Sequence, residues 1–536
     1  MVKSSGATLI RPGRWRGWTL ALSGLLSCFV AHASAEAPKE ESYYKIVSVA
    51  AAKAATDSRS KNWQPAPDGL PLEISGMSFL PDGRLAVAIR KGEVWLLDGV
   101  SDDPPSNVSY HRFANALHEP LGLLYHDGSL YTAQRSELTQ LRDVDGDDVA
   151  DEYLTAAKGW GVTGHYHEYA YGPKLDAQGN LWVTLNIGMG LKGDQLKRVV
   201  PNAALGYRQG RWRGWGMKVT AKGEMIPVCA GMRSPSGIGA NAAGDMFYTD
   251  QQGNWVATNS MHHMREGAFF HHAEALASMN EPGSPISGVR EVPSGLPLPQ
   301  AVKKFPLLRP PAVWFPYKKV GQSATDIVMD SSGGKFGPFA GQFFVGEFTQ
   351  AGVNRVFLEK VNGEYQGACF PFRLGFASAV LRLVQGKDGS MFVGLTNRGW
   401  SSLGSASYGL QRLEWTGKTP FEIQEMRARN DGFELVFTMP VDRESASRTD
   451  AYRLESYTYL YHATYGSDEI SKEPLPVKSA VVSEDGRRVR LEVEGLRELF
   501  VHELDASGVT NELGQPLLHP AAYYTLNQIP DAATQP

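Results

Sequence analysis

The sequence has 536 residues, 42% of them hydrophobic, and carries a formal net charge of −4. This length predicts one large domain and a smaller one, and the hydrophobic content excludes a disordered chain. We expect no nucleic-acid partner, because phosphate binding needs a clustered basic surface and none is found along the chain.

Residues 1–35 have the pattern of a secretory signal peptide. Basic residues precede the apolar run at 19–31, and Ala33-Ser34-Ala35 follows it as a cleavage site. A lipoprotein signal at Cys28 is the alternative. The run is short for a membrane span, and no other window is long and apolar enough, so we expect no transmembrane segment after cleavage. The expected location is periplasmic or secreted.

A repeated turn pattern follows a polar segment, 36–65, which we expect to be an extended lead-in. Gly, any residue, then Leu, Met or Phe recurs six times after a short apolar run, at Gly83, Gly128, Gly179, Gly244, Gly341 and Gly389. Each copy predicts a strand, a tight turn and a second strand. One hairpin cannot bury both faces, so the copies must pack together. We predict an all-β fold with a six-bladed β-propeller over 66–416.

Two other segments complete the expected organisation. The longest insertion lies between the fourth and fifth repeats, and its prolines predict an irregular loop over one face. After Trp415 the residues alternate with period two between Gly-containing turns. This pattern predicts a small C-terminal β-sandwich over 417–536, immunoglobulin-like in its strand pattern.

Polar residues recur in the turns that precede the first, innermost strand of each repeat and in the turns that follow its second strand. Both kinds of turn should reach the same mouth of the central channel. The candidates for binding a ligand there are His165, His167, Arg233, Ser234, Gln134, Arg135, Asp250, Gln251, Gln252, Gly253, Asn397 and Arg398. Surface turns commonly use Gly, Asn, Asp and Pro, so Arg, His and Gln favour a ligand site. The alternative is that these groups only join the blades by hydrogen bonds.

His165 and His167 flank Tyr166, and alternate residues of a strand point to one face. Such a pair could act as a general base and its partner, bind a metal, or be structural.

Asp143 begins a short acidic segment that resembles a calcium-binding loop. Ca²⁺ takes six to eight oxygens, and the candidate ligands are the carboxylates of Asp143, Asp145, Asp147 and Asp151 with the carbonyl of Val149. The segment departs from an EF-hand loop, because Asp148 stands at the glycine position and no Glu stands at the twelfth. The alternative is an acidic, solvated turn.

With the repeats and the segments RSPSG, TDQQGNW and TNRGW, residues 70–416 resemble the secreted six-bladed propellers of the soluble glucose/sorbosone dehydrogenase superfamily. The likeness is strongest to the planctomycete and verrucomicrobial branch labelled membrane-bound dehydrogenase or sorbosone-dehydrogenase-like. The resemblance implies pyrroloquinoline quinone (PQQ) bound at the channel mouth together with Ca²⁺.

The resemblance also implies roles for single residues. The family's catalytic His stands before a Gly-Pro turn, which here points to His167 or His165. Its Arg-Asn pair matches Arg233-Ser234, with Ser in place of Asn, and its calcium-bearing turn matches Gln251-Gln252-Gly253 without the usual Pro and acidic pair. Arg398 stands where the family supplies Arg to the cofactor carboxylates, while the fifth-blade Lys has no counterpart in GEFTQ.

Three functions are therefore open at this point. The first is PQQ-dependent oxidation of a sugar or related alcohol, with a separate electron acceptor such as a cytochrome, because the sequence has no haem-attachment motif. The second is a metal-dependent lactonase with Glu73, Asn186 and Asp250 as ligands. The third is a non-catalytic propeller that binds a carbohydrate or a protein.

Overall fold

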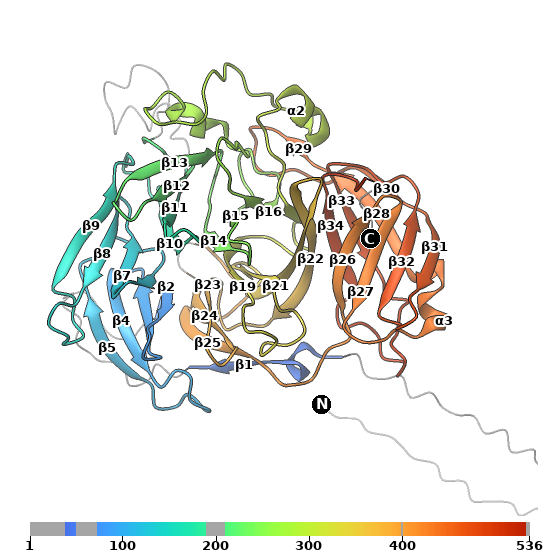
Figure 1. The fold of residues 1–536 in the computed structure, drawn as a ribbon, viewed down its shortest axis with the longest axis horizontal. Helices are drawn as coiled ribbons and strands as arrows, with labels where there is room; N and C mark the ends of the chain where they lie inside the picture. Colours follow the sequence, from blue (N-terminus) through green and yellow to red (C-terminus); the bar gives the residue numbers. More distant parts are fainter. Residues whose placement is uncertain (1–37, 50–71, 189–209, 398–399, 532–536) are drawn as a thin grey trace, which may run out of the picture. The chain divides into compact units, whose positions relative to one another are not determined.

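The computed structural model describes residues 38–49, 72–188, 210–397 and 400–531, so the predicted signal peptide lies outside the described residues. Six groups of four antiparallel strands follow one another along the chain (Figure 1). The strands of the first three groups are β2 (Ile74–Phe79), β3 (Leu85–Ile89), β4 (Glu93–Asp98) and β5 (Ser109–Ala114); β6 (Leu124–His126), β7 (Ser129–Ala133), β8 (Glu137–Arg142) and β9 (Glu152–Lys158); β10 (Ala170–Leu175), β11 (Leu181–Leu185), β12 (Trp215–Val219) and β13 (Met225–Ala230). Those of the last three are β14 (Gly237–Ala240), β15 (Met246–Asp250), β16 (Asn259–His263) and β18 (Val313–Phe315); β19 (Ala324–Met329), β20 (Phe343–Glu347), β21 (Gly352–Val361) and β22 (Glu364–Leu374); β23 (Val380–Gln385), β24 (Met391–Thr396), β25 (Tyr408–Trp415) and β1 (Tyr44–Ser48).

The first strand of each group lies at the centre of the ring. The innermost strands β2, β6, β10, β14, β19 and β23 each contact the next, and β23 contacts β2 again. This closed circuit confirms the six-bladed β-propeller. The fold follows from the repeats, since each hairpin buries its apolar faces against its neighbours.

The repeated glycines occupy the turns between the first and second strands of the blades. All six have positive φ, for example 99° at Gly83 and 81° at Gly179. A side chain is strained in this conformation and glycine is not, so the turns can be recognised in the sequence.

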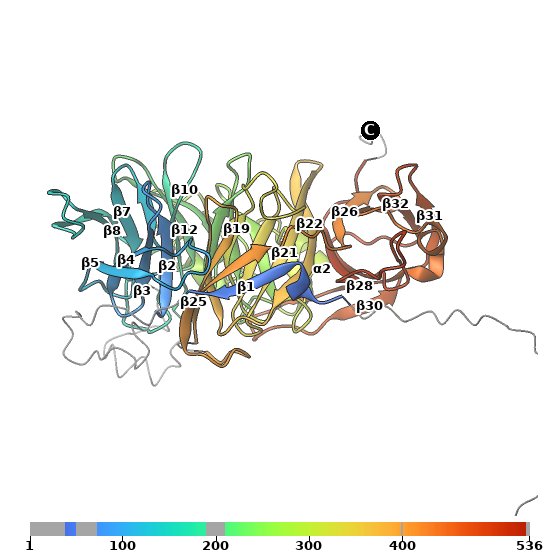
Figure 2. The same ribbon diagram turned by 90° about the horizontal axis from the view of Figure 1, so that it is seen from below.

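The N-terminal strand closes the ring. Strand β1 pairs antiparallel with β25, with Tyr44 opposite Trp415 and Ser48 opposite Gln411 (Figure 2). The sequence predicts an extended lead-in at 36–65 and a propeller that starts at residue 66. The described part of that segment instead supplies the outer strand of the sixth blade, so the boundary at 66 does not hold. A strand of five residues with no partner nearby in the sequence carries too little pattern to be assigned to a sheet.

The long insertion is partly regular rather than wholly irregular. It contains η2 (Ala273–Ser278), β17 (Leu296–Pro297) and α2 (Leu298–Lys304). Pro299 lies in the first turn of α2, where a missing N–H costs no hydrogen bond. Strand β17 pairs with β29 (Leu460–Tyr461) of the C-terminal region.

The C-terminal strands form the predicted sandwich, but one of its two sheets continues a propeller blade. The first sheet contains β26 (Ile423–Arg429), β27 (Gly432–Phe437), β32 (Arg488–Val493) and β31 (Val477–Val482). The second contains β34 (Ala521–Leu526), β33 (Phe500–Asp505), β28 (Arg453–Thr458) and β30 (Ile470–Pro474), and β34 pairs with β22 of the fifth blade. The short helices η1 (Glu40–Ser42), α3 (Arg443–Ala446) and η3 (Thr449–Ala451) complete the elements. Because β34 pairs with β22, the fifth blade and the sandwich share one eight-stranded sheet.

Arg355 on β21 is a buried cation at this junction. Its guanidinium lies 4.1 Å from the ring centroids of both Phe339 and Phe370. It donates hydrogen bonds to the carbonyls of Ile423 (2.6 Å) and Gln424 (2.8 Å), which lead into the sandwich. Burial lowers the pKa of Arg355 to about 10, so the group remains charged at neutral pH. A buried charge with fixed acceptors holds the two parts in one register.

His519 joins the N-terminal segment to the sandwich. Its ring nitrogens lie 2.7 Å from Glu422 Oε1 and 3.0 Å from Glu40 Oε1, and Glu40 also accepts a hydrogen bond from the backbone N–H of Leu374. Burial lowers the pKa of His519, but the two carboxylates outweigh burial and raise it to about 9. The imidazolium is therefore the form present at neutral pH.

Replacing this charge should destabilise the protein in a pH-dependent way. The pKa of His519 is higher in the folded protein than the unfolded value of about 6.5, so its protonation stabilises the folded state. This stabilisation is complete below pH 6.5 and is lost as the pH rises through 9. We expect His519→Gln to lower the free energy of unfolding by on the order of 1–3 kcal/mol at pH 6–7. The difference from wild type should shrink as the pH rises from about 6.5 to 9, measured by denaturant unfolding across this range. The exposed His111→Gln is the control, and a difference that is constant with pH would contradict the assignment.

Candidate functional site

A cavity of about 230 Å³ lies where the ends of the blades meet. Its lining includes residues that enter the innermost strands, such as Leu121 and Ser323, and residues that leave the second strands, such as Arg90 and Thr396. The full lining is Glu73, Ser75, Arg90, Leu121, Tyr166, His167, Tyr169, Tyr171, Arg233, Ser234, Ser236, Gln251, Gln252, Gln322, Ser323, Phe348, Leu381, Thr396, Trp400 and Tyr465. All six blades and the C-terminal region contribute to it.

The predicted site residues divide into those that line the cavity and those that do not. His167, Arg233, Ser234, Gln251 and Gln252 line it. His165, Gln134, Arg135, Asp250, Gly253 and Asn397 do not line it, and Arg398 lies outside the described residues. Several members of the second group support the first.

Asp250 organises the turn that carries Arg233 and Ser234. Its buried carboxylate accepts hydrogen bonds from the backbone N–H groups of Arg233 (2.8 Å), Ser234 (2.7 Å) and Gln251 (2.9 Å). Burial raises the pKa of Asp250 to about 6, although these donors and the Arg233 charge act in the opposite direction. Asp250 is thus ionised at neutral pH. Its role here is to hold the backbone of this turn.

Arg233 is the buried cation of the cavity. It is 4% exposed, and a Cβ on Gly253 would lie 1.8 Å from its Nε. Glycine is therefore required at 253 for the guanidinium to occupy this place. Burial lowers the pKa of Arg233, and Asp250 opposes that shift. An Arg side chain stays protonated at neutral pH even so.

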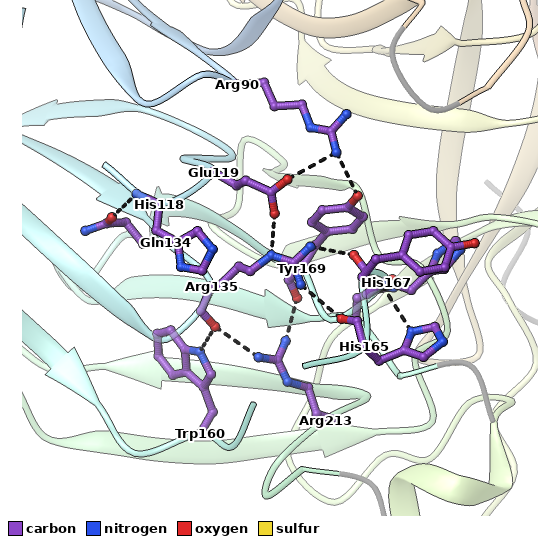
Figure 3. A network of polar contacts seen from close by, with 12 residues as sticks. Arg90, His118, Glu119, Gln134, Arg135, Trp160, His165, His167, Tyr169 and Arg213 are labelled. Carbon is purple, nitrogen blue, oxygen red and sulfur yellow. Dashed lines mark hydrogen bonds and ion pairs between the residues drawn. The ribbon is translucent and has the colours of Figure 1, made fainter. Parts of the chain in front are cut away.

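Arg135 holds the loop that carries the two histidines (Figure 3). It donates hydrogen bonds to the carbonyls of His165 (3.0 Å) and Tyr166 (2.6 Å) and forms an ion pair with Glu119. Its guanidinium also lies 4.8 Å from the ring centroid of Tyr169. The sequence predicts that Arg135 binds a cofactor, whereas its donors are used by the protein. Packing decides the direction of this side chain, so the sequence alone could not.

Further contacts fix the same loop. Arg213 donates to the carbonyls of Tyr169 (2.8 Å) and Arg135 (2.9 Å). The buried carboxylate of Glu168 accepts from the backbone N–H and the hydroxyl of Thr163, both at 2.7 Å. Glu168 is therefore directed to the loop backbone. Gln134 likewise accepts a hydrogen bond from the backbone N–H of His118 (Figure 3).

His167 is a neutral imidazole at the cavity wall. Burial, together with electrostatic repulsion from the neighbouring His165, Arg233 and Arg135, lowers its pKa to about 4. Burial also lowers the pKa of His165, whose ring centroid is 5.6 Å from that of His167. An imidazole that is uncharged at pH 7 can accept a proton and can also accept a hydrogen bond from a hydroxyl group.

Of the predicted lactonase ligands, Glu73 lines the cavity, whereas Asn186 and Asp250 do not. The Asn186 amide nitrogen donates to the carbonyls of His167 and Ile187, and Asp250 accepts the three backbone N–H groups described above.

The acidic segment lies between strands β8 and β9, and none of its residues lines the cavity. Carboxylate oxygens of Asp143, Asp145 and Asp151 lie within 4.8 Å of one another, which is the spacing of a cation site. Asp147 is outside this group and accepts from the N–H of Val149. Asp148 pairs with Arg84, which ties the segment to the first blade.

Sequence reasoning missed several cavity residues. Arg90 follows strand β3 at the same place in its blade as Gln251 in the fourth, so a comparison of equivalent positions could have found it. Tyr465 belongs to the C-terminal region and has no repeat to point to it. Below the cavity, Arg382 on β23 donates to the carbonyls of Ser75 (2.7 Å) and Ser236 (3.1 Å) across the channel.

Comparison with known proteins gives a distant likeness only. No protein-family model matches the sequence, and no curated protein matches it. Among solved structures, the chain is similar to the PQQ-bound aldose sugar dehydrogenase of Streptomyces coelicolor (12% identity, 71% of this chain and 99% of that one, TM-score 0.44). It is also similar to the soluble aldose sugar dehydrogenase of Escherichia coli in its apo form (13% identity, 64% of this chain and 96% of that one, TM-score 0.41). A third similar structure is the PQQ domain of pyranose dehydrogenase from Coprinopsis cinerea (11% identity, 64% of this chain and 94% of that one, TM-score 0.40). At these scores the function has to be argued from the site itself.

The low pKa of His167 can be measured directly. We expect an NMR titration of the imidazole to give a pKa near 4, and Arg233→Gln to raise it, because removing a positive charge favours the protonated ring. Arg84→Gln, which removes a cation of the first blade, should leave the value unchanged. A wild-type pKa near the ordinary 6.5 would contradict the buried environment described here.

Proposed function

We propose that the protein oxidises a sugar or a related alcohol with PQQ held in the cavity. The observation that carries this proposal is that a neutral imidazole, His167, and a buried cation, Arg233, line the same cavity. Oxidation of a carbinol removes a proton and a hydride. A neutral His can take the proton, and a buried positive charge favours negative charge that develops next to it.

The chemistry of the lining fits PQQ, which is a flat aromatic molecule with several carboxylates and a quinone. Arg233 and Arg90 supply positive charge, and Tyr169 and Tyr171 supply aromatic surface. Arg90 is held by Glu119 (3.1 Å) and by the hydroxyl of Tyr169 (3.2 Å). These residues would hold the group, and Arg398 remains a predicted contact. When bound, PQQ supplies a two-electron acceptor for the hydride.

The residues of the chain then have separate tasks. His167 accepts the proton of the substrate hydroxyl, and Arg135 and Asn186 position its loop through backbone carbonyls. Ser75, Ser236 and Gln322 offer hydroxyl and amide groups to the other hydroxyls of a sugar. The His165 ring is stacked against that of His167, with a centroid distance of 5.6 Å, and its presence further disfavours protonation of His167.

The electrons have to leave to a separate acceptor, such as a cytochrome or another carrier. The sequence pattern of a secretory signal supports a periplasmic or secreted location. Among the described residues, no helix is both long and apolar enough to cross a membrane.

Reconstitution tests the reaction. With PQQ and Ca²⁺ added, we expect the purified protein to acquire a bound quinone spectrum and to oxidise aldoses or alcohols with an artificial dye. His167→Ala should lower kcat/KM by about 100-fold or more. Because the base must be neutral, kcat/KM should fall on the acid side near pH 4 and stay level through pH 6.5.

His126→Ala on strand β6 is the matched control, since this partly buried histidine does not line the cavity. Thermal unfolding of the His167→Ala variant should remain close to wild type. Turnover that survives this substitution would remove His167 from the mechanism. A bound saccharide without turnover would favour the non-catalytic propeller, and metal-dependent hydrolysis of a lactone would favour the lactonase.

Calcium at the acidic segment remains a prediction of the sequence. If Ca²⁺ binds Asp143, Asp145 and Asp151, we expect added Ca²⁺ to raise the thermal unfolding midpoint and a chelator to reverse the shift. Asp145→Asn should raise the Ca²⁺ concentration needed for the same shift at least tenfold. The variant Asp485→Asn, in an exposed turn, should not change this concentration. An unfolding midpoint that Ca²⁺ does not change would leave an acidic, solvated turn.

A further inference from the structure

Exposed aromatic side chains gather at the edge of the cavity. Among the described residues, five Tyr, Trp or Phe side chains are more than a third exposed, and three of the five line this one cavity. These are Tyr166 (64% exposed), Trp400 (58%) and Tyr465 (58%). Clustered exposed apolar surface marks a binding site more often than single exposed residues do.

The three rings come from separate parts of the chain, and two of them adjoin the two residues of the proposed chemistry. Tyr166 lies with its ring centroid 3.9 Å from that of His167. The Arg233 guanidinium lies 5.5 Å from the ring centroid of Tyr465. A ligand that contacts these rings therefore also reaches His167 and Arg233.

Tyr465 is held in place by backbone contacts between the C-terminal region and the fourth blade. The N–H groups of Gly466 and Ser467 donate to the carbonyls of Gly253 (3.0 Å) and Ala257 (2.9 Å). Asn254 Nδ2 donates to the carbonyl of Ala463 at 3.1 Å. These hydrogen bonds fix the backbone before and after Tyr465 in the sequence. The position of its ring is thus built into the fold.

The mixture of groups at this edge matches the surface of a saccharide. A sugar ring has an apolar face of C–H groups, which packs on aromatic rings, and an edge of hydroxyls, which bind amides and hydroxyls such as Gln252, Gln322 and Ser323. The exposed rings lie at the edge of this cavity, so sugar units beyond one that enters the cavity would lie against them.

We propose that Tyr166, Trp400 and Tyr465 form an aromatic rim that binds the second and further units of an oligosaccharide whose terminal unit enters the cavity. The inference rests on the proposed function, because it takes the cavity as the place of oxidation. It also assigns a task to the C-terminal region, which supplies Tyr465 to a site otherwise formed by the propeller.

Equilibrium binding to the full chain tests this proposal. The probes are glucose, α-1,4- and β-1,4-linked glucose oligomers and β-1,4-linked xylose oligomers of up to about six units. Their binding is measured by calorimetry with and without PQQ. We expect affinity to rise with chain length in at least one series. Tyr465→Ala should weaken binding of the longest ligand about 5- to 10-fold, which corresponds to one lost aromatic contact. Tyr465→Phe should retain the affinity, since it keeps the ring.

The exposed Tyr153→Ala on strand β9 is the matched control and should not change binding. Affinity that is independent of length in every series, or an effect of Tyr465→Ala no larger than that of Tyr153→Ala, would overturn the rim. Length-dependent binding without any oxidation would instead support the rim and contradict the proposed function. Oxidation of single sugars without length-dependent binding would support the proposed function and contradict the rim.

Discussion

The structure depends on closure of the ring of blades by the N-terminal strand. Strand β1 pairs with β25 and so completes a sheet whose other three strands come from the far end of the propeller. An open ring would expose a sheet edge and separate the first blade from the sixth. With the ring closed, the innermost strand β2 contacts β23, and residues from both blades, such as Ser75 and Thr396, line one cavity.

Closure is reinforced by charged side chains that join distant segments. Glu40 lies in η1, directly before β1, and it contacts both the fifth blade and His519 of the sandwich. Arg355 makes a second connection by donating to the carbonyls at the start of β26. Glu40 has charged partners and Arg355 has carbonyl acceptors within hydrogen-bond distance, which offsets part of the cost of burial. Propeller and sandwich are therefore joined by a continuous sheet and by buried ion contacts.

The cavity is organised by groups that do not reach it. Asp250 fixes the turn of Arg233 through backbone N–H groups, and Arg135 fixes the loop of His167 through backbone carbonyls. The side chains of Arg233 and His167 therefore line the cavity while the backbone that carries them is held. Such a division is what a preorganised polar site requires, because charge that is already in place costs no reorganisation during a reaction. The positive charge of Arg233 and Arg135 also keeps His167 neutral.

The blades and their number can be predicted from local pattern, because a turn with positive φ requires glycine and because buried strands require apolar residues at regular spacing. The sequence also placed His167, Arg233, Ser234, Gln251 and Gln252 at the mouth of the channel, since equivalent turns of a repeat must lie at the same end. Only the tertiary structure decided that β1 closes the ring, that Arg135 and Asp250 hold backbone, and that Tyr465 reaches the cavity from the C-terminal region. The physical reason is that these outcomes depend on packing between segments far apart in the chain, and local pattern carries no information about which distant neighbour a side chain meets.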